Sequence, residues 1–250
     1  MKRTVVVSGA SSGIGAACAQ RFAREGYNVL LTALDEPGLA AVAGTLPEGN
    51  HHYIAGDWLD PQTPARVASV IEDRWERVDA VVSCAGAFVS TDLQADEYEA
   101  WSRAFRLVFE GAWRLTRAVM PLLRDHGRIV HVSSIHGGRA ERNASGYAVG
   151  KAAMDQLCRG LAVELAPRGI LVNAIAPGFV RTPMSVRNDG VDELRTDWFK
   201  SNYVQGHHLP LRRAAEPHEI AGVAHFLCGP DASYITGQII TVDGGLTITF

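Results

Sequence analysis

The sequence predicts an α/β fold: a Rossmann-type doubly wound parallel β-sheet flanked by helices, formed by residues 1–250 as a single domain. Short apolar, β-branched runs alternate along the chain with longer segments of helical periodicity. The short runs lack polar alternation, which is typical of strands buried on both faces. With 250 residues, of which 47% are hydrophobic, the chain can bury one large core.

The pattern places the elements in the following order. We expect strands at 4–7, 29–32, 80–82, 128–132, 170–174 and 238–242, and helices at 13–25, 61–77, 97–119, 146–166 and 217–228. The stretch from Pro177 to Arg213 has no clear strand. Long excursions of this kind are usually functional, so we expect a substrate-loop insertion at about 183–213.

Composition limits the classes of partner. The formal net charge is -3 and the basic residues are scattered, which argues against nucleic acid or an anionic membrane and favours a small-molecule substrate. No apolar run is long enough for a signal peptide or a membrane span. The four cysteines form no CxxC pair, so reduced thiols and a cytoplasmic location are expected. The adjacent His207 and His208 lack a further ligand pattern, and no metal is assigned.

A glycine-rich turn follows the first expected strand and opens a helix. It reads Gly9-Ala-Ser-Ser-Gly13-Ile-Gly15. Glycines let the backbone approach a pyrophosphate, and the helix N-terminus offers unpaired N–H groups to it. The spacing is GxxxGxG, and a purely structural turn remains the alternative to a dinucleotide site.

Asp35 bears on the identity of the cofactor. It lies 20 residues after Gly15, where an acidic side chain usually accepts hydrogen bonds from the adenosine ribose. Ala33, Leu34 and Ser12 offer no basic group for a 2′-phosphate. The sequence therefore favours NAD, with NADP as the alternative, and Asp35 can equally serve as a helix N-cap.

Three polar residues form a candidate catalytic group: Ser134, Tyr147 and Lys151. Tyr147 and Lys151 are four apart on an expected helix and share one face. An ammonium about 5 Å from the phenol, at an effective dielectric of about 20, would favour phenolate by roughly 3 kcal/mol. Ser134 can hydrogen-bond the substrate oxygen. The spacing YxxxK is common by itself, and the three residues together carry the prediction.

In these motifs the chain resembles the short-chain dehydrogenase/reductases over its whole length. The motifs occur in family order: Gly9-x-x-x-Gly13-x-Gly15, Cys84-Ala-Gly86, Ser134 thirteen residues before Tyr147, Tyr-x-x-x-Lys, and Pro177-Gly178-Phe-Val-Arg-Thr182.

The resemblance implies a role for each matching residue. Tyr147 is then the acid/base, Ser134 orients the substrate, and Lys151 tunes Tyr147 and holds the nicotinamide ribose. Asp57 and Trp58 would contact adenine, and Thr182 with Val180 would clamp the carboxamide. The C-terminal stretch from Gly237 to Gly245 is similar to a subunit-packing tail, which implies a homotetramer or homodimer. The cofactor set is Gly9, Ser11, Ser12, Gly13, Ile14, Gly15, Asp35, Asp57, Trp58, Ala85, Gly86, Tyr147, Lys151, Pro177, Gly178, Val180 and Thr182.

The chain departs from the family pattern at two places. Counted back from Gly111, the family's catalytic Asn falls on Val108, whose side chain cannot hydrogen-bond. The family's Asn-Asn-Ala-Gly stretch reads Ser83-Cys84-Ala85-Gly86, so bracing of the sheet must come from elsewhere. We expect a slower or rerouted proton relay.

The substrate side is expected to include His136, Trp198 and Tyr203. His136 lies two residues past Ser134, with solvent exposure as the alternative. The two aromatics belong to a candidate lid in which they either contact substrate or pack a hinge. Lys200 and His208 beside them, and a resemblance to sugar-type members, suggest a sugar, a polyol or another small hydroxylated substrate.

The sequence thus predicts an NAD(P)-dependent oxidoreductase that interconverts a secondary alcohol and a ketone by hydride transfer. The alternative is a cofactor-binding sensor or a weakly active relative, suggested by Val108 and Ser83-Cys84. An intact Ser134, Tyr147 and Lys151 favour the enzyme, because a sensor needs no acid/base.

Overall fold

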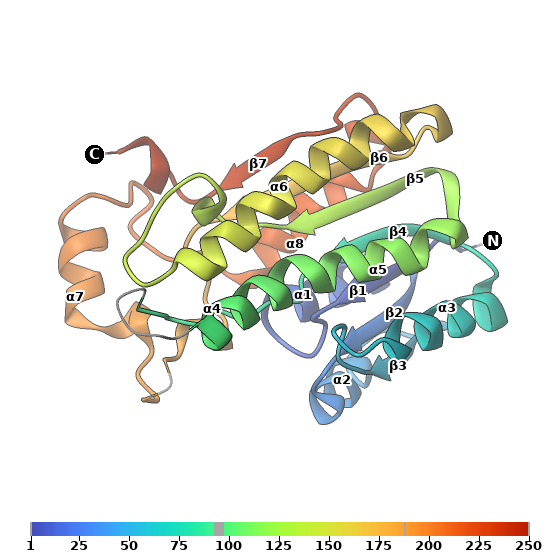
Figure 1. The fold of residues 1–250 in the computed structure, drawn as a ribbon, viewed down its shortest axis with the longest axis horizontal. Coiled ribbons are helices and arrows are strands. Elements are labelled where there is room, and N and C mark those ends of the chain that lie inside the picture. Colours follow the sequence, from blue (N-terminus) through green and yellow to red (C-terminus); the bar gives the residue numbers. More distant parts are fainter. Residues whose placement is uncertain (1, 93–97, 188, 250) are drawn as a thin grey trace.

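The computed structural model describes residues 2–92, 98–187 and 189–249. In these residues one parallel sheet has the strand order β3-β2-β1-β4-β5-β6-β7 (Figure 1). The strands are β1 (Thr4–Ser8), β2 (Asn28–Ala33), β3 (His52–Ala55), β4 (Val78–Ser83), β5 (Leu123–Val132), β6 (Leu171–Pro177) and β7 (Ile239–Val242). The predicted doubly wound α/β fold is confirmed.

Helices cover both faces of the sheet (Figure 1). They are α1 (Gly13–Arg24), α2 (Glu36–Ala43), α3 (Gln62–Trp75), α4 (Tyr98–Phe105), α5 (Gly111–Val119), α6 (Ser145–Leu165), α7 (Asp197–Phe199) and α8 (Pro217–Leu227). One core lies under α1, α2 and α8, and a second lies under α3, α5 and α6. No helix in the described residues is long and apolar enough to cross a membrane.

Three elements were not predicted from the sequence: β3, α2 and the three-residue α7. β3 is a four-residue edge strand in which His52 and Tyr53 are only half-buried, so it lacks the continuous apolar run of the central strands. α2 begins with Pro37 and Gly38 in its first turn and buries Leu39 alone, which leaves little helical periodicity to detect.

The predicted helix over 97–119 is interrupted. α4 and α5 are joined by a π-helical turn, Arg106–Glu110, in which Val108 is fully buried. π-helical turns are rare and often lie at functional sites.

The strand order reverses between β1 and β4. The chain runs outward from β1 to β2 and β3, then returns to β4 on the other side of β1. In open α/β sheets, ligands bind at the carboxyl ends of the strands beside such a reversal.

Candidate active site

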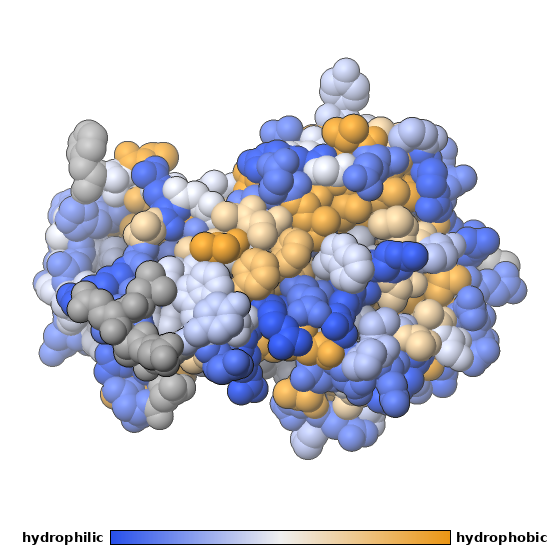
Figure 2. All heavy atoms as spheres, viewed as in Figure 1, coloured by the Kyte–Doolittle hydropathy of each residue, from blue (hydrophilic) through white to orange (hydrophobic). Residues whose placement is uncertain are grey.

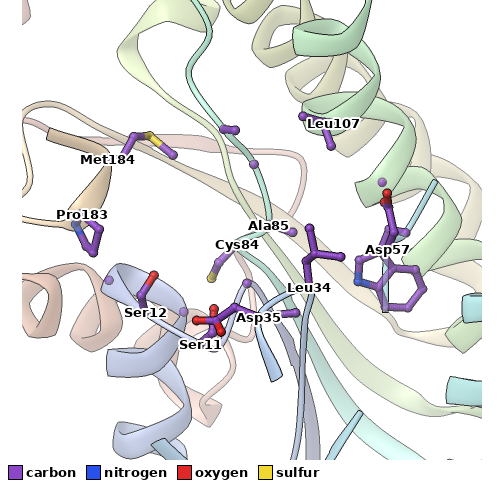
Figure 3. A pocket seen from close by; sticks show the side chains of 18 of the residues that line it. Ser11, Ser12, Leu34, Asp35, Asp57, Cys84, Ala85, Leu107, Pro183 and Met184 are labelled. Atoms are coloured by element: carbon purple, nitrogen blue, oxygen red, sulfur yellow. The ribbon is translucent and has the colours of Figure 1, made fainter. Parts of the chain in front are cut away.

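A cavity of about 450 Å³ lies at this reversal. Figure 3 shows Ser11, Ser12, Leu34 and Asp35 along one part of its wall, and Asp57, Leu107 and Met184 in other parts of it. The full lining is Gly9, Ser11, Ser12, Gly13, Ile14, Gly15, Ala33, Leu34, Asp35, Gly56, Asp57, Trp58, Leu59, Cys84, Ala85, Gly86, Ala87, Arg103, Leu107, Gly111, Thr182, Pro183 and Met184.

The glycine turn forms the cavity floor, and close packing requires each glycine. A Cβ on Gly15 would lie 2.1 Å from the Gly9 carbonyl oxygen. Gly9 has φ +66°, and a Cβ there would lie 2.9 Å from the Ala85 nitrogen. A Cβ on Gly13 would meet the Thr182 Cγ2 atom at 3.1 Å. All three glycines line the cavity, so the turn presents backbone without a Cβ where a phosphate would approach.

The N-terminus of α1 faces this floor. Ser12 is its N-cap residue, and the Ser12 side chain makes no capping hydrogen bond. The first N–H groups of α1 therefore remain available for an anion. A bare glycine turn and an uncapped helix N-terminus together fit the pyrophosphate of a dinucleotide.

Ser8 supplies the bracing that the sequence left unassigned. Its hydroxyl accepts hydrogen bonds of 3.2 Å from both the Cys84 and the Ala85 backbone N–H groups. The end of β1 is thereby fastened to the loop after β4, beneath Gly86.

Asp35 both caps a helix and lines the cavity. Its side chain accepts from the Gly38 N–H at 3.2 Å, which is the N-cap of α2. The two readings of this residue are compatible, because a carboxylate has further acceptor sites for a ribose. Leu34 beside it is 74% exposed and carries no charge for a 2′-phosphate.

The other predicted cofactor residues, apart from Tyr147 and Lys151, divide into those that line the cavity and those that do not. Asp57 and Trp58 lie in the cavity wall, and Trp58 is buried against Gly111. Pro177, Gly178 and Val180 lie outside the lining, and Val180 packs in the core and forms a bridge with Ala215. The sequence missed Arg103 and Leu107, because only the fold brings α4 and the π-helical turn after it to the cavity.

Ser134, Tyr147 and Lys151 come together beside the cavity, and each is buried. The Lys151 Nζ donates to the Val132 carbonyl at 2.7 Å and lies 5.5 Å from the centre of the Tyr147 ring. It also lies 3.9 Å from the Cβ position of Gly86, a residue of the cavity wall. The group thus borders the end of the cavity at Gly86.

Burial dominates the titration of this group. It raises the pKa of Tyr147 to about 12, against an opposing hydrogen bond with Ser134. Burial also lowers the pKa of Lys151 to about 8, although Cys84 and Asp155 act in the opposite direction. The sequence led us to expect a lowered pKa for Tyr147, and for the protein alone that direction is wrong, because desolvation of the phenolate outweighs the opposing hydrogen bond with Ser134.

Val108 and Lys151 both lie close to Gly86. The Val108 Cγ2 is 3.8 Å from the Cβ position of Gly86, and the Lys151 Nζ is 3.9 Å from the same position. Val108 packs in a small buried cluster with Ala112, Tyr147 and Met154. The candidate catalytic group is therefore apolar on its α4–α5 side.

His136 joins the group through Ser134. Its Nδ1 lies 3.2 Å from the Ser134 Oγ, and its ring centre lies 5.7 Å from that of Tyr147. The His136 Nε2 pairs with Glu141 at 2.7 Å. Sequence reasoning missed Glu141, although it lies five residues past His136 in the same loop.

The predicted lid aromatics pack mainly on each other. The Tyr203 ring lies 4.7 Å from Phe179 and 5.2 Å from Phe199, which is 2% exposed. Trp198 is 56% exposed and stacks edge-on against Tyr203. These contacts favour hinge packing for Tyr203. Among the described residues, no group of three or more His, Cys, Asp or Glu side chains could hold a metal ion.

Comparison with known proteins places the chain in a family. The family model described as enoyl-(acyl carrier protein) reductase matches residues 9–247. The chain is 36% identical over 265 aligned residues to oxidoreductase UcpA of Escherichia coli O157:H7, which covers 98% of this chain and 95% of that protein.

Solved structures of dehydrogenases also match this chain over nearly its whole length. A short-chain dehydrogenase/reductase from Brucella melitensis, described as a glucose/ribitol dehydrogenase, matches with a TM-score of 0.88 at 31% identity, covering 98% of this chain and 99% of that one. The aldohexose dehydrogenase of Thermoplasma acidophilum matches with a TM-score of 0.87 at 29% identity, covering 100% and 95%. Together with the glycine turn and the buried Ser134, Tyr147 and Lys151, these matches show that the chain is an oxidoreductase of the short-chain dehydrogenase/reductase family.

Proposed function

We propose that the protein interconverts a secondary alcohol and a ketone with NAD as cofactor. The observation that carries the proposal is the burial of Ser134, Tyr147 and Lys151 at one end of a cavity whose floor is a glycine turn. A bound nicotinamide would supply hydride transfer at that end. The protein would hold the substrate oxygen at Ser134 and exchange its proton at the Tyr147 hydroxyl.

The raised pKa of Tyr147 supports reduction of a ketone as the favoured direction at neutral pH. With its pKa at about 12, the phenol is protonated and ready to donate to a ketone oxygen. Alcohol oxidation needs the phenolate, so we expect its rate to rise with pH across the alkaline range.

Asp35 supports NAD over NADP. Its carboxylate lies in the wall at the end of β2, where a 2′-phosphate would meet negative charge. Arg103 lies in the same lining but comes from α4, not from the end of β2.

The side chains around His136 favour a neutral, hydroxyl-rich substrate such as a sugar or polyol. The imidazole of His136 is held between Ser134 and Glu141, and burial together with Glu141 raises the pKa of Glu193. Carboxylates on this side offer acceptors to hydroxyl groups and repel an anionic substrate. Two matched structures are described as sugar or polyol dehydrogenases, which agrees with this choice.

A homo-oligomer is part of the proposal. Trp113 on α5 and Val149 and Val163 on α6 are exposed. Figure 2 shows apolar atoms gathered over these two helices on the face viewed. Exposed apolar patches of this kind often mark protein interfaces.

The deciding experiment screens the purified protein with NAD⁺ and NADP⁺ against secondary alcohols, sugars, polyols and hydroxy acids, following nicotinamide absorbance. We expect turnover that Tyr147→Phe abolishes while the dissociation constant for NAD stays within about twofold. Binding of NAD without turnover across the panel would support the sensor instead.

A further inference from the structure

Two buried polar side chains lie side by side beneath Lys151. Ser83 ends β4 and pairs in register with His131 of β5. They alternate with Val81 and Ile129, which belong to the core under α3, α5 and α6. Both side chains therefore point toward the sheet face that α6 covers, on strands about 4.8 Å apart.

Neither side chain has a partner among the described residues. Both ring nitrogens of His131 and the Ser83 Oγ make no hydrogen bond, although His131 is fully buried and Ser83 is 1% exposed. A buried polar group left without a partner costs about 1–3 kcal/mol. Two such groups side by side therefore call for a shared partner.

The Lys151 ammonium has hydrogen-bond donors available for such a shared partner. Its ammonium carries three donors, and one of them bonds the carbonyl of Val132, the residue after His131. Val108 on the α4–α5 side is apolar and accepts nothing through its side chain. The charge on Lys151 lowers the pKa of His131, after the larger effect of burial, to about 4, which places the two groups within electrostatic reach.

We propose that His131 and Ser83 hold an internal water molecule that hydrogen-bonds the Lys151 ammonium, so that His131 is a positioning residue for the proton-handling group. The proposal rests on the proposed function of Tyr147 and Lys151. Buried waters typically make two to four hydrogen bonds, and this site supplies that number. Lys151 donates to the water, and the water donates to the unprotonated ring nitrogen of His131 and to the Ser83 hydroxyl.

His131 remains neutral in this role. Because its pKa is about 4, the ring keeps one donor and one acceptor at every pH where the enzyme is expected to work. The other groups facing Lys151 are Asp155 from α6 and Cys84 from the end of β4, and both favour its charged form. The water is thus held from the sheet side, opposite Val108.

The test compares His131→Leu, which removes the water ligand, with His131→Asn, which keeps a donor and an acceptor. On a substrate found in the panel, we expect His131→Leu to lower kcat about tenfold, or about 1.4 kcal/mol, with the dissociation constant for NAD within about twofold. The alkaline limb of its pH profile should shift, and Asn should restore most of both properties. Ser83→Ala should give a smaller loss in the same direction.

Trp75→Phe is the matched control, since its indole N–H is also buried without a partner but lies at the end of α3. If His131→Leu matches the wild type in kcat and pH profile, or if it loses activity only in proportion to thermal stability as Trp75→Phe does, the proposal is overturned.

A second measurement needs neither a substrate nor a folded variant. A crystal structure of the wild type at about 1.5 Å should show a water within hydrogen-bond distance of Lys151 Nζ, His131 and Ser83. A direct contact between these side chains, with no water, would overturn the proposal. Turnover that survives Tyr147→Phe would instead refute the proposed function and leave this water site to be judged by the crystal structure.

Discussion

The free energy of unfolding of Lys151→Met, relative to that of the wild type, should be higher at neutral pH than at alkaline pH. Lys151 is 4% exposed, and burial depresses its pKa from 10.5 to about 8. The folded protein binds this proton less readily than the unfolded chain does, so the charged lysine destabilises the fold below pH 8. That cost declines as the pH rises from 8 toward 10.5.

The size of the effect follows from the two pKa values. The cost is about 3 kcal/mol at pH 7 and about 1 kcal/mol at pH 9.5, a change of about 2 kcal/mol. The replacement also removes the bond to the Val132 carbonyl; the part of that bond that the neutral amine makes is lost at both values of pH, and the extra strength of the ammonium bond is already contained in the pKa of Lys151. The difference between the two values therefore isolates the charge.

The assay is urea denaturation of the wild type and Lys151→Met at pH 7 and pH 9.5. We expect the stability of the variant relative to the wild type to fall by about 2 kcal/mol between them. Lys200→Met is the control, because Lys200 is exposed and pairs with Asp197 on the surface. A difference that does not change with pH would refute the burial argument.

Three further predictions concern the cavity and the residues beside it. Gly15→Ala should weaken NAD binding, measured by calorimetry, more than tenfold, because the new Cβ would lie 2.1 Å from the Gly9 oxygen. Gly222→Ala in α8 is the control, since nothing lies within 4 Å of its Cβ position, and it should leave NAD binding unchanged. Equal binding in both variants would contradict the packing argument. Asp35→Asn keeps an acceptor that can cap α2 but loses the negative charge. The ratio of NADP affinity to NAD affinity should therefore rise roughly tenfold while the thermal stability stays unchanged. An unchanged ratio would show that Asp35 does not select the cofactor. Val108→Asn should raise kcat a few-fold when introduced into the wild type, and by more when introduced into His131→Leu. No gain in either background would show that the lack of a polar side chain at position 108 does not limit the proton relay.

The central sheet could be predicted from the sequence because its strands are buried on both faces. β1, β2 and β4 each contain a run of three apolar residues (5–7, 29–31 and 80–82), whereas β3 lies at an edge and begins with His52 and Tyr53. The glycine turn was visible for a related reason, since its spacing is local and follows directly after β1.

The candidate site was harder to predict where it depends on tertiary contacts. Glu141 reaches His136 across a loop, and Arg103 joins the cavity only through the packing of α4. The titration of Tyr147 was predicted in the wrong direction because spacing gives the charge of Lys151 but not the depth of burial. The unpartnered nitrogens of His131 likewise appear only when β4 and β5 are seen side by side.

The π-helical turn between α4 and α5 has a geometric consequence for the cavity. Such a turn accommodates one more residue than an α-helical path, which rotates everything beyond it by about 100° around the axis. α4 can therefore direct Arg103, with Leu107 of the turn, toward the cavity, while α5 directs Leu115 and Val119 into the sheet core. Because of this one extra residue, the continuous helical segment from α4 to α5 lines the cavity along its first half and packs in the sheet core along its second half.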